Sequence, residues 1–411
     1  MNNDTVARLF AGALALMSVA GWAETESVNG VTWTYYTSYS YGATITGMEG
    51  TASDVTIPYM LGGYEVKRIG SDVFKGNSYL RRVTIPWYIR EIGSDAFYSC
   101  VNLDEVKLSE GLERIGSEAF FGCQSLQSVE IPSSVNDIYS GAFAMCGIRR
   151  LTLNKWCPYR LSEMLGGTTK LLTSLTLGAE TERNIDQSFF DGCTALSSIS
   201  IAATHAKYQV VNGLVLSKDG KELVAVPPGR SSISIPSTVT SLGWNVIGAC
   251  SNLIETASIP GVKKLGDWVV GYDERNPPKS VNLHGVRAVS DYAFGGCYTL
   301  ASLTIPASVK IIGENAFGGC YRLKTISVAK GNTAFKYTGG MLLTKNGRRL
   351  ITVSRNVTSV AVPNGVQTID CAAFAGCTKL TKVSLPKTVW CIGDEGANDP
   401  VRQAASSASF A

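Results

Sequence analysis

The sequence has little of what enzymes and metal proteins need. Its 411 residues include only two histidines, His205 and His284, and charged residues make up 17% of the chain. No GxSxG, GxxxxGK or GxGxxG segment occurs, and neither histidine adjoins a serine or cysteine motif. Neighbouring acids such as Asp104 and Glu105 are typical of solvated loops. These absences predict a protein that is not an enzyme and that holds no cofactor.

Long apolar runs are also absent, except for one at the N-terminus. Arg8 precedes the run from Leu9 to Ala23, which ends in small residues, and this arrangement is typical of a signal peptide cut after Ala23. An uncleaved anchor is the alternative, although about fifteen apolar residues are short for a bilayer span. No later stretch reaches the roughly twenty apolar residues of a transmembrane helix. We therefore expect a secreted or cell-surface protein with no transmembrane segment after signal cleavage.

What the sequence has in quantity is repetition. Phe74, Phe97, Phe120 and Phe143 follow one another at steps of 23 residues, each five residues after an isoleucine. One period reads LxxVxIPxxVxxIGxxAFxxC, and a period of this length predicts a solenoid. The alternating apolar residues predict a short parallel strand, which the proline ends because it has no amide hydrogen. The Ser-Asp or Ser-Glu pair before Ala-Phe predicts one capped helical turn, whose phenylalanine packs under the next strand.

The period is broken at three places. The step from Phe143 to Phe190 is 47 residues, so one coil around residues 155–178 is degenerate. The steps from position 190 to 247 and from 317 to 374 are both 57, which is 34 more than one period. Each insert carries a hairpin signature with Asp219-Gly220 or Asn346-Gly347 at the turn, where both positions tolerate positive φ.

The predicted organisation follows from these breaks. It comprises a signal peptide (1–23), an N-terminal capping β segment (24–60), a solenoid (61–397) with hairpin inserts near 205–230 and 333–357, and an Ala/Ser-rich tail (398–411) that does not fold with the array.

The coils resemble a known family. Residues 92–135, IGSDAFYSCVNLDEVKLSEGLERIGSEAFFGCQSLQSVEIPSSV, are similar to the leucine-rich repeats of BspA-like bacterial and protist surface proteins. Members of that family also interrupt the stack with a hairpin like NGLVLSKDGKELVAVPPG, and the resemblance covers roughly residues 44–397. It implies a leucine-rich repeat solenoid of the α/β type with two β-hairpin inserts. It also implies adhesion to host or neighbouring-cell proteins.

Eleven cysteines in an exported protein would ordinarily indicate disulfides. Eight of them share one slot, three residues after the phenylalanine position: Cys100, Cys123, Cys146, Cys193, Cys250, Cys297, Cys320 and Cys377. We predict a buried spine of thiols, each donating its S–H to a corner carbonyl. Zinc is the alternative, but no CxxC pair exists and only two imidazoles are available, so no metal site is expected. Any disulfide is expected among Cys157, Cys371 and Cys391, which lie off the spine.

The outward side of the strands is one candidate binding face. It is flat and rich in hydroxyl groups, and its residues include Arg82, Thr84, Glu105, Lys107, Glu130, Arg150, Thr152, Thr176, Thr304 and Lys382. These residues either keep an exposed sheet soluble or present the face to a protein or a glycan. The charged end, at Arg82, Glu105, Lys107 and Glu130, is the preferred contact region.

Aromatic residues near the N-terminus form a second candidate surface. They are Trp33, Tyr35, Tyr36, Tyr39 and Tyr41, and strand alternation places Trp33 and Tyr35 on the same side. They form either a contact surface or a cap that closes the open end of the core.

The sequence thus favours a secreted or surface protein that binds extracellular or cell-surface proteins. A structural or matrix scaffold without a specific ligand is one alternative. A glycan-binding or ice-binding module is another, although Lys107 and Glu130 interrupt the threonine column that it would use. A net charge of +4 is small for this length and gives no basis for nucleic-acid binding.

Overall fold

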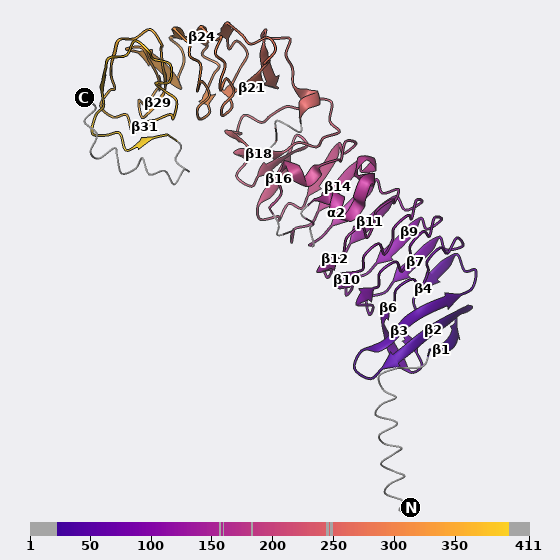
Figure 1. Ribbon diagram of the computed structural model, residues 1–411. Helices are drawn as coiled ribbons and strands as arrows, with labels where there is room; N and C mark the ends of the chain where they lie inside the picture. The colour runs from indigo at the N-terminus through magenta and orange to yellow at the C-terminus, as the bar shows by residue number, and fades with distance from the viewer. Residues whose placement is uncertain are drawn as a thin grey trace, which may run out of the picture. The chain divides into compact units, whose positions relative to one another are not determined.

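The computed structural model describes residues 23–155, 158, 160–181, 184–243, 246 and 250–393. The chain divides into two compact units, unit 1 (residues 1–230 and 243–249) and unit 2 (residues 231–242 and 250–411), and each is considered by itself (Figure 1). Residues 1–22 of the predicted signal peptide, the predicted tail and Cys157 lie outside the described residues. Both units are built of stacked coils with short parallel strands, so the predicted leucine-rich repeat solenoid is confirmed.

Each regular coil of unit 1 contributes one strand to a front sheet and one to a side sheet. The front sheet consists of β4 (Asp54–Thr56), β7 (Arg82–Ile85) and β9 (Glu105–Leu108), followed by β11 (Ser128–Ile131), β13 (Arg150–Leu153), β14 (Ser174–Leu177) and β15 (Ser198–Ile201). The side sheet contains β6 (Tyr64–Ile69), β8 (Glu91–Ile92), β10 (Arg114–Ile115) and β12 (Asp137–Ile138), and β5 (Met60–Leu61) pairs with β6. Strands β7 and β11 end directly before Pro86 and Pro132, as predicted.

An antiparallel sheet closes the N-terminal end of unit 1. It is formed by β1 (Glu24–Val28), β2 (Val31–Ser38) and β3 (Gly42–Glu49), and β3 then pairs in parallel with β6. The Trp33 ring meets the Phe74 ring edge on, with centroids 6.1 Å apart. The exposed end of the first coil is therefore covered by aromatic residues of this N-terminal cap.

The predicted helical turn takes a different form in the regular coils. Asp72, Asp95 and Glu118 have φ of 61°, 56° and 53°, outside the helical region. The Phe74 amide donates to the Ala96 carbonyl of the next coil at 2.7 Å rather than along its own coil. Because alternate amides bond between coils, the segment becomes a ladder of stacked turns and cannot continue as a helix.

The phenylalanines of these turns form a stacked column in the core. Phe74, Phe97, Phe120 and Phe143 lie with successive ring centroids 4.7, 4.9 and 5.0 Å apart, and the rings are within 7° of parallel. All four side chains are buried. The prediction that they pack in the core is confirmed, and their nearest aromatic neighbours are their own equivalents in adjacent coils.

The degenerate coil keeps its front strand in register with the neighbouring coils, but it has short helices where the regular coils have stacked turns. It contains α2 (Leu161–Leu165) and the 3-10 helix η1 (Gly166–Leu171), and η2 (Gln187–Phe190) follows in the next coil. The Phe143 amide donates to the Met164 carbonyl at 3.1 Å, so α2 takes the place of the missing turn. On the front sheet β13, β14 and β15 pair without a register shift.

The insert of unit 1 is a three-stranded meander of β16 (Tyr208–Val211), β17 (Leu214–Ser217) and β18 (Glu222–Ala225). The predicted hairpin corresponds to β17 and β18, and β16 was not predicted. Gly220 has φ of 73°, but Asp219 is not in the left-handed region. The Asp219 carboxylate instead accepts from the Ser217 hydroxyl at 2.7 Å and the Lys221 amide at 3.1 Å. The turn is thus held by its aspartate side chain, and the expectation of positive φ at both positions is wrong.

Unit 2 repeats this plan. Its elements are β19 (Ser241–Leu242), η3 (Ser251–Leu253), β20 (Val262–Leu265), β21 (Trp268–Tyr272), β22 (Ser280–Asn282), β23 (Ala288–Val289), β24 (Ser302–Ile305), β25 (Ile311–Ile312), β26 (Thr325–Val328), β27 (Phe335–Thr338), β28 (Met341–Thr344), β29 (Arg349–Val353), β30 (Ser359–Ala361), β31 (Thr368–Ile369), β32 (Lys382–Ser384) and β33 (Cys391–Ile392). The front strands pair as β22–β24–β26 and β30–β32, and the second insert is the meander β27–β28–β29.

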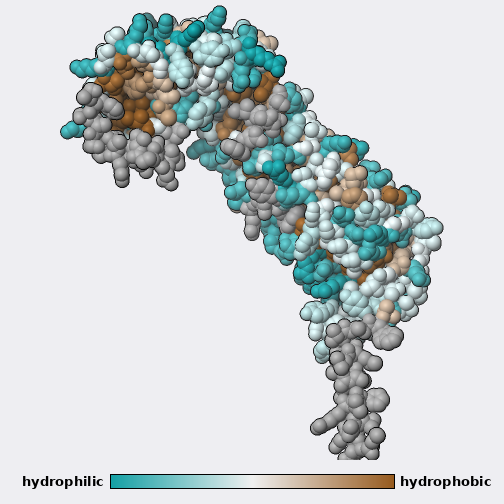
Figure 2. Space-filling model, in the orientation of Figure 1, coloured by the Kyte–Doolittle hydropathy of each residue, from teal (hydrophilic) through white to brown (hydrophobic). Residues whose placement is uncertain are grey.

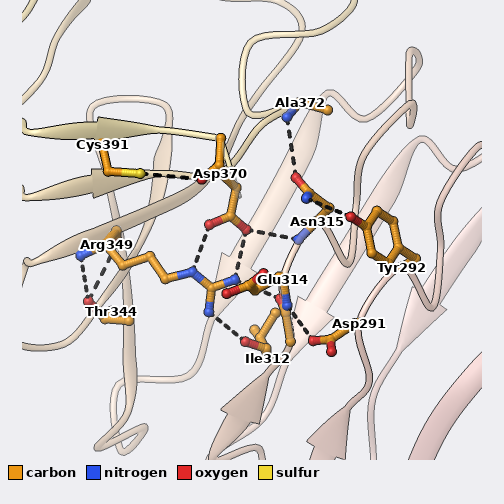
Figure 3. A network of polar contacts seen from close by, with 12 residues as sticks. Asp291, Tyr292, Ile312, Glu314, Asn315, Thr344, Arg349, Asp370, Ala372 and Cys391 are labelled. Carbon is orange, nitrogen blue, oxygen red and sulfur yellow. Dashed lines mark hydrogen bonds and ion pairs between the residues drawn. The ribbon is translucent and has the colours of Figure 1, made fainter. Parts of the chain in front are cut away.

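An ion pair between the partly buried Arg349 and the buried Asp370 joins the second insert to its neighbouring coils. From β29, the Arg349 guanidinium contacts both carboxylate oxygens of Asp370, with Nε–Oδ1 at 2.7 Å and Nη2–Oδ2 at 2.8 Å (Figure 3). The same guanidinium donates to the carbonyls of Ile312 at 2.8 Å and Gly313 at 2.7 Å. Because the Asp370 carboxylate also accepts from the Asn315 amide at 3.2 Å, this cluster is internally satisfied and has a structural role.

The last described coil exposes positions that are buried in the coil before it. Val383, Leu385 and Ile392 are 42%, 39% and 44% exposed. Their equivalents one period earlier, Val360, Val362 and Ile369, are at most 6% exposed. Hydrophobic residues are accordingly visible at the surface around β29 and β31 (Figure 2).

We expect Phe120→Ala to lower the free energy of unfolding by about 3 to 5 kcal/mol, because a fully buried ring is removed from the stacked column. Urea unfolding followed by circular dichroism measures the loss. Phe121→Ala is the matched control, because the Phe121 ring is only partly buried and, among the described residues, stacks only on Tyr98, so its loss should be about 1 kcal/mol. Equal losses for the two variants would contradict the stacked core.

Candidate functional site

The front sheet of unit 1 arranges its outward side chains in two columns. Parallel pairing places Arg82 beside Glu105, and Thr84 beside Lys107. Farther along, Glu130 lies beside Thr152, which lies beside Thr176. The columns follow from the two-residue alternation of strands whose other face is buried. The predicted face is therefore formed in unit 1 by neighbouring side chains.

Two shallow grooves run across this face. The larger, of about 380 Å³, is lined by predicted residues from four strands: Glu105, Lys107, Glu130, Arg150, Thr152 and Thr176. The smaller, of about 290 Å³, brings Arg82 and Thr84 together with Glu105 and Lys107. We call these the front groove and the adjacent groove. Eight of the ten predicted residues thus line one or the other.

The remaining two predicted residues belong to unit 2. Thr304 lies on β24 and accepts a hydrogen bond from the Ser327 hydroxyl at 3.2 Å. Lys382 is exposed on β32. Neither residue lines the front groove or the adjacent groove.

The front groove crosses an interruption in the front sheet. Strands β9 and β11 are consecutive in the stack, yet they belong to different hydrogen-bonded sheets. On the side sheet the same two coils pair without a break, through Arg114 with Asp137 and Ile115 with Ile138. Among the described strands, these two coils are therefore hydrogen-bonded through their side strands but not through their front strands, and the groove lies on the front.

Charged side chains in the front groove and the adjacent groove differ in whether they are paired. Arg82 forms an ion pair with Asp54, and a hydrogen bond from Ser53 together with Arg82 lowers the pKa of Asp54 below its usual value. By contrast, the side chains of Glu105, Lys107 and Arg150 make no ion pair or hydrogen bond within the described ranges. Unpaired charges of both signs thus face the groove.

Two groove residues were missed from the sequence. Ser128 and Ser174 lie on either side of Arg150 in the flanking column and line the front groove. Their signal was present, since each occupies the same slot of the period as Arg82 and Arg150.

The predicted aromatic surface divides into two parts. Trp33 and Tyr35 are 1% and 3% exposed, so both face the core as the alternation predicted. Tyr36 is 39% exposed, whereas Tyr39 and Tyr41 are 97% and 63% exposed. The first pair belongs to the N-terminal cap. Tyr39 and Tyr41 instead line a third groove, of about 460 Å³, which we call the side groove.

Seven of the eight predicted spine cysteines are buried in the described coils, and the eighth, Cys377, is partly buried. The Sγ atoms of Cys100, Cys123 and Cys146 lie 3.0, 3.3 and 3.0 Å from the carbonyl oxygens of Phe74, Phe97 and Phe120. Burial raises the pKa of the Cys100 thiol to about 12, so the thiol remains protonated and can donate. Cys320 makes the same contact with the Phe294 carbonyl at 3.3 Å, so each of these four thiols satisfies a carbonyl of the neighbouring coil. Among the described residues the predicted bond is not made by Cys193 or Cys250.

The cysteines outside the spine differ in accessibility. Cys371 is exposed and Cys391 is partly buried, and both are free thiols. Cys157 lies outside the described residues. A disulfide between Cys157 and either Cys371 or Cys391 therefore stays a prediction.

His205 has a structural role at a corner. It is 1% exposed, its Nε2 lies 2.9 Å from the Thr181 hydroxyl, and its Nδ1 accepts from the amides of Lys207 and Tyr208, both at 3.1 Å. Both ring nitrogens are therefore occupied. Asn332 occupies the equivalent position in the second insert, where its Oδ1 accepts from the amides two and three residues ahead at 2.8 and 2.7 Å. His284 is exposed.

Among the described residues, no group of three or more His, Cys, Asp or Glu side chains is arranged to hold a metal ion. None of their helices combines the length and the apolar character needed to cross a membrane.

Comparison with known proteins gives a family match. The sequence profile of the BspA type leucine rich repeat region matches residues 52–163, 229–339 and 351–396, in six copies. No match was found among curated proteins. Similar solved structures include a leucine rich cell surface protein of Faecalibacterium prausnitzii, with 21% identity over 93% of this chain and 97% of that chain and a TM-score of 0.32.

Two further structures cover a similar share of the chain. One is a leucine-rich repeat protein of Bacteroides ovatus, with 20% identity over 90% of each chain and a TM-score of 0.35. The other is the pneumococcal vaccine antigen PcpA, with 15% identity over 92% of this chain and 95% of that chain and a TM-score of 0.38.

The burial of the spine predicts selective thiol reactivity. In the native protein at pH 8, iodoacetamide should label Cys371 readily and should leave Cys100 unlabelled until the protein is unfolded in urea, because the Cys100 thiol is both inaccessible and protonated. Fragmentation of the tryptic peptides by tandem mass spectrometry measures each site separately and distinguishes Cys371 from Cys377, which lies on the same peptide. Similar labelling rates at both sites in the native protein would refute the buried spine.

The buried histidine predicts a pH dependence of stability. Burial lowers the pKa of His205, with contributions from Lys218 and Lys207, so the unfolded chain takes up a proton before the folded chain does. Stability should therefore fall as pH drops below about 6.5, by at most about 1.4 kcal/mol per pH unit. His205→Asn, which installs the residue found at the equivalent position of the second insert, should remove this component.

Urea unfolding between pH 4.5 and 7.5 tests this prediction. The exposed His284→Asn variant is the matched control and should retain the slope of the unaltered protein. If His205→Asn also retained that slope, protonation of His205 would not be its cause.

Proposed function

The chain belongs to the BspA-type leucine-rich repeat family, and from this premise we propose that it is a secreted or cell-surface protein whose front face binds another protein. Proteins of this family are typically found at the cell surface and are generally non-catalytic. The partner is an extracellular or cell-surface protein, and the outcome of binding is adhesion. Residues 1–23 serve as the signal peptide that exports the chain.

The observation that carries this proposal is the set of unpaired charges in the front groove. Glu105, Lys107 and Arg150 are exposed on rigid strands and have no protein partner within the described residues. An interface that covered these charges without pairing them would pay the cost of desolvating them. A partner with charges of the opposite sign at matching positions would offset that cost. Because both signs are present, the partner must itself carry both, which favours a protein over a polyanion.

The dimensions of the face agree with a protein partner. Seven front strands at about 4.8 Å spacing extend over about 30 Å. A stable interface buries about 800 Å² on each partner, which corresponds to a patch of similar length. Hydroxyl groups of Thr152, Thr176 and Ser174 extend the surface beyond the charges and suit the polar rim of an interface.

The test is binding of the purified protein to a panel of extracellular-matrix and cell-surface proteins by biolayer interferometry. The variant is Lys107→Glu combined with Arg150→Glu, and Arg82 is left unchanged because it is paired with Asp54. We expect saturable binding by the unaltered protein and a Kd at least about tenfold higher for the variant. The association rate should also fall as salt is raised.

The matched control is Lys170→Glu combined with Lys218→Glu, which makes the same change in charge outside both front-face grooves. This control should bind as the unaltered protein does. Equal weakening in the two variants would mean that only net charge matters. No binding across the panel would favour the alternative function, a structural scaffold without a specific ligand.

A further inference from the structure

The side groove lies where the N-terminal cap meets the side sheet. The loop between β2 and β3 carries Tyr39 and Tyr41 over the first coils. Arginines from three successive side strands or their approaches, Arg68, Arg90 and Arg114, line the same groove. These residues come from four separate parts of the sequence, and neither the front groove nor the adjacent groove shares any of them.

Both tyrosines are available to a ligand. Tyr39 is 97% exposed and Tyr41 is 63% exposed, so the Tyr39 ring and the face of the Tyr41 ring opposite Arg68 are accessible, and neither hydroxyl has a partner among the described residues. The Arg68 guanidinium lies 5.3 Å from the Tyr41 ring centroid, which helps to orient that ring. Gly42 fixes the loop beside them, because it has φ of +74° and a side chain there would collide with the Glu65 carbonyl oxygen.

The three arginines have N–H donors beyond those that their contacts within the protein use. Arg68 and Arg114 share one carboxylate, that of Glu91, at 3.4 and 2.8 Å. Arg90 contacts the Glu113 carboxylate at 3.5 Å and donates to the Gly111 carbonyl at 3.1 Å. A guanidinium has five N–H donors in a planar fork. These contacts therefore hold the three forks in place and leave donors for a ligand.

The balance of charge in the side groove is positive. Three arginines and Lys67 face the carboxylates of Glu65 and Glu113 in the lining, and the Glu91 carboxylate that Arg68 and Arg114 share is a third, which leaves one positive charge in excess. The carboxylates of Glu65 and Glu113 disfavour a long polyanion but can accept hydrogen bonds from hydroxyl groups. A volume of about 460 Å³ lies within the roughly 300 to 1,000 Å³ of small-ligand sites.

We propose that the side groove binds an acidic saccharide, that is, a glycan end that carries a sialic or uronic acid. The apolar face of a sugar ring would pack on Tyr39 or Tyr41, and the sugar carboxylate would meet an arginine fork in the bidentate geometry that such forks favour. Ring hydroxyls would donate to Glu65 and Glu113. The chain thereby has a glycan site at its N-terminal end that is separate from the front face.

Isothermal titration calorimetry of the purified protein tests this assignment with three probes. They are 3′-sialyllactose, an unsulfated chondroitin tetrasaccharide and lactose, which is the neutral match of the first. We expect at least one acidic probe to bind with a Kd at least about tenfold below that of lactose. Tyr39→Ala combined with Tyr41→Ala should raise that Kd at least about tenfold, and Arg90→Gln should reduce the preference over lactose.

Two controls separate this site from the front face and from a general effect of aromatic loss. Tyr79→Ala removes a tyrosine that is 58% exposed but lines none of the three grooves, and it should leave saccharide binding unchanged. The Lys107→Glu and Arg150→Glu variant should also bind the saccharide normally, so failure of one site is distinguishable from failure of the other. The assignment would be overturned if neither acidic probe bound more tightly than lactose, or if the double tyrosine variant bound the acidic probe as well as the unaltered protein does.

Discussion

The spacing between coils is the constraint on which the rest of this protein depends. Parallel strands lie about 4.8 Å apart, and the rings of Phe97 and Phe120 stack at 4.9 Å. A Cβ on Gly93 would lie 2.6 Å from the carbonyl carbon of Gly70 in the preceding coil, so the corner accepts only glycine. Cys123 fits because its thiol is small and reaches the Phe97 carbonyl. In the regular coils of unit 1, an inward slot therefore holds a residue that packs on its own equivalent.

This constraint explains which parts of the fold could be predicted from the sequence. The strands, the proline ends, the phenylalanine core and the thiol spine all follow from slots that recur at a fixed step. The left-handed residues Asp72 and Asp95 were not predictable in the same way, because their conformation depends on amides that bond to the next coil. The extra strand of the first insert did have a local sequence signal, the Asn212-Gly213 dipeptide, which is typical of a tight hairpin turn. Both residues have positive φ in the turn before β17.

The candidate sites were predictable only to the extent that they lie within one periodic column. The front residues Glu105, Lys107 and Arg150 could be placed on one face from their slots alone. The groove between them could not be predicted, because it coincides with a missing pairing between β9 and β11 that no residue pattern indicates. The side groove combines a loop with three coils, so Tyr41 and Arg90 meet only through the N-terminal cap.

The repeat also separates positions that stability restricts from positions that it leaves open. Along the front strands the inward residues are uniform, as Val83, Val106 and Val129 show, because each packs in the core shared with its neighbours. The adjoining outward residues have no such contact, and Lys107 and Glu130 break the threonine column there. A charge at an outward slot neither fills the core nor supports the strand. Such a charge is available for electrostatic contacts with a partner. For this reason we assign recognition to the outward positions rather than to the repeated inward residues.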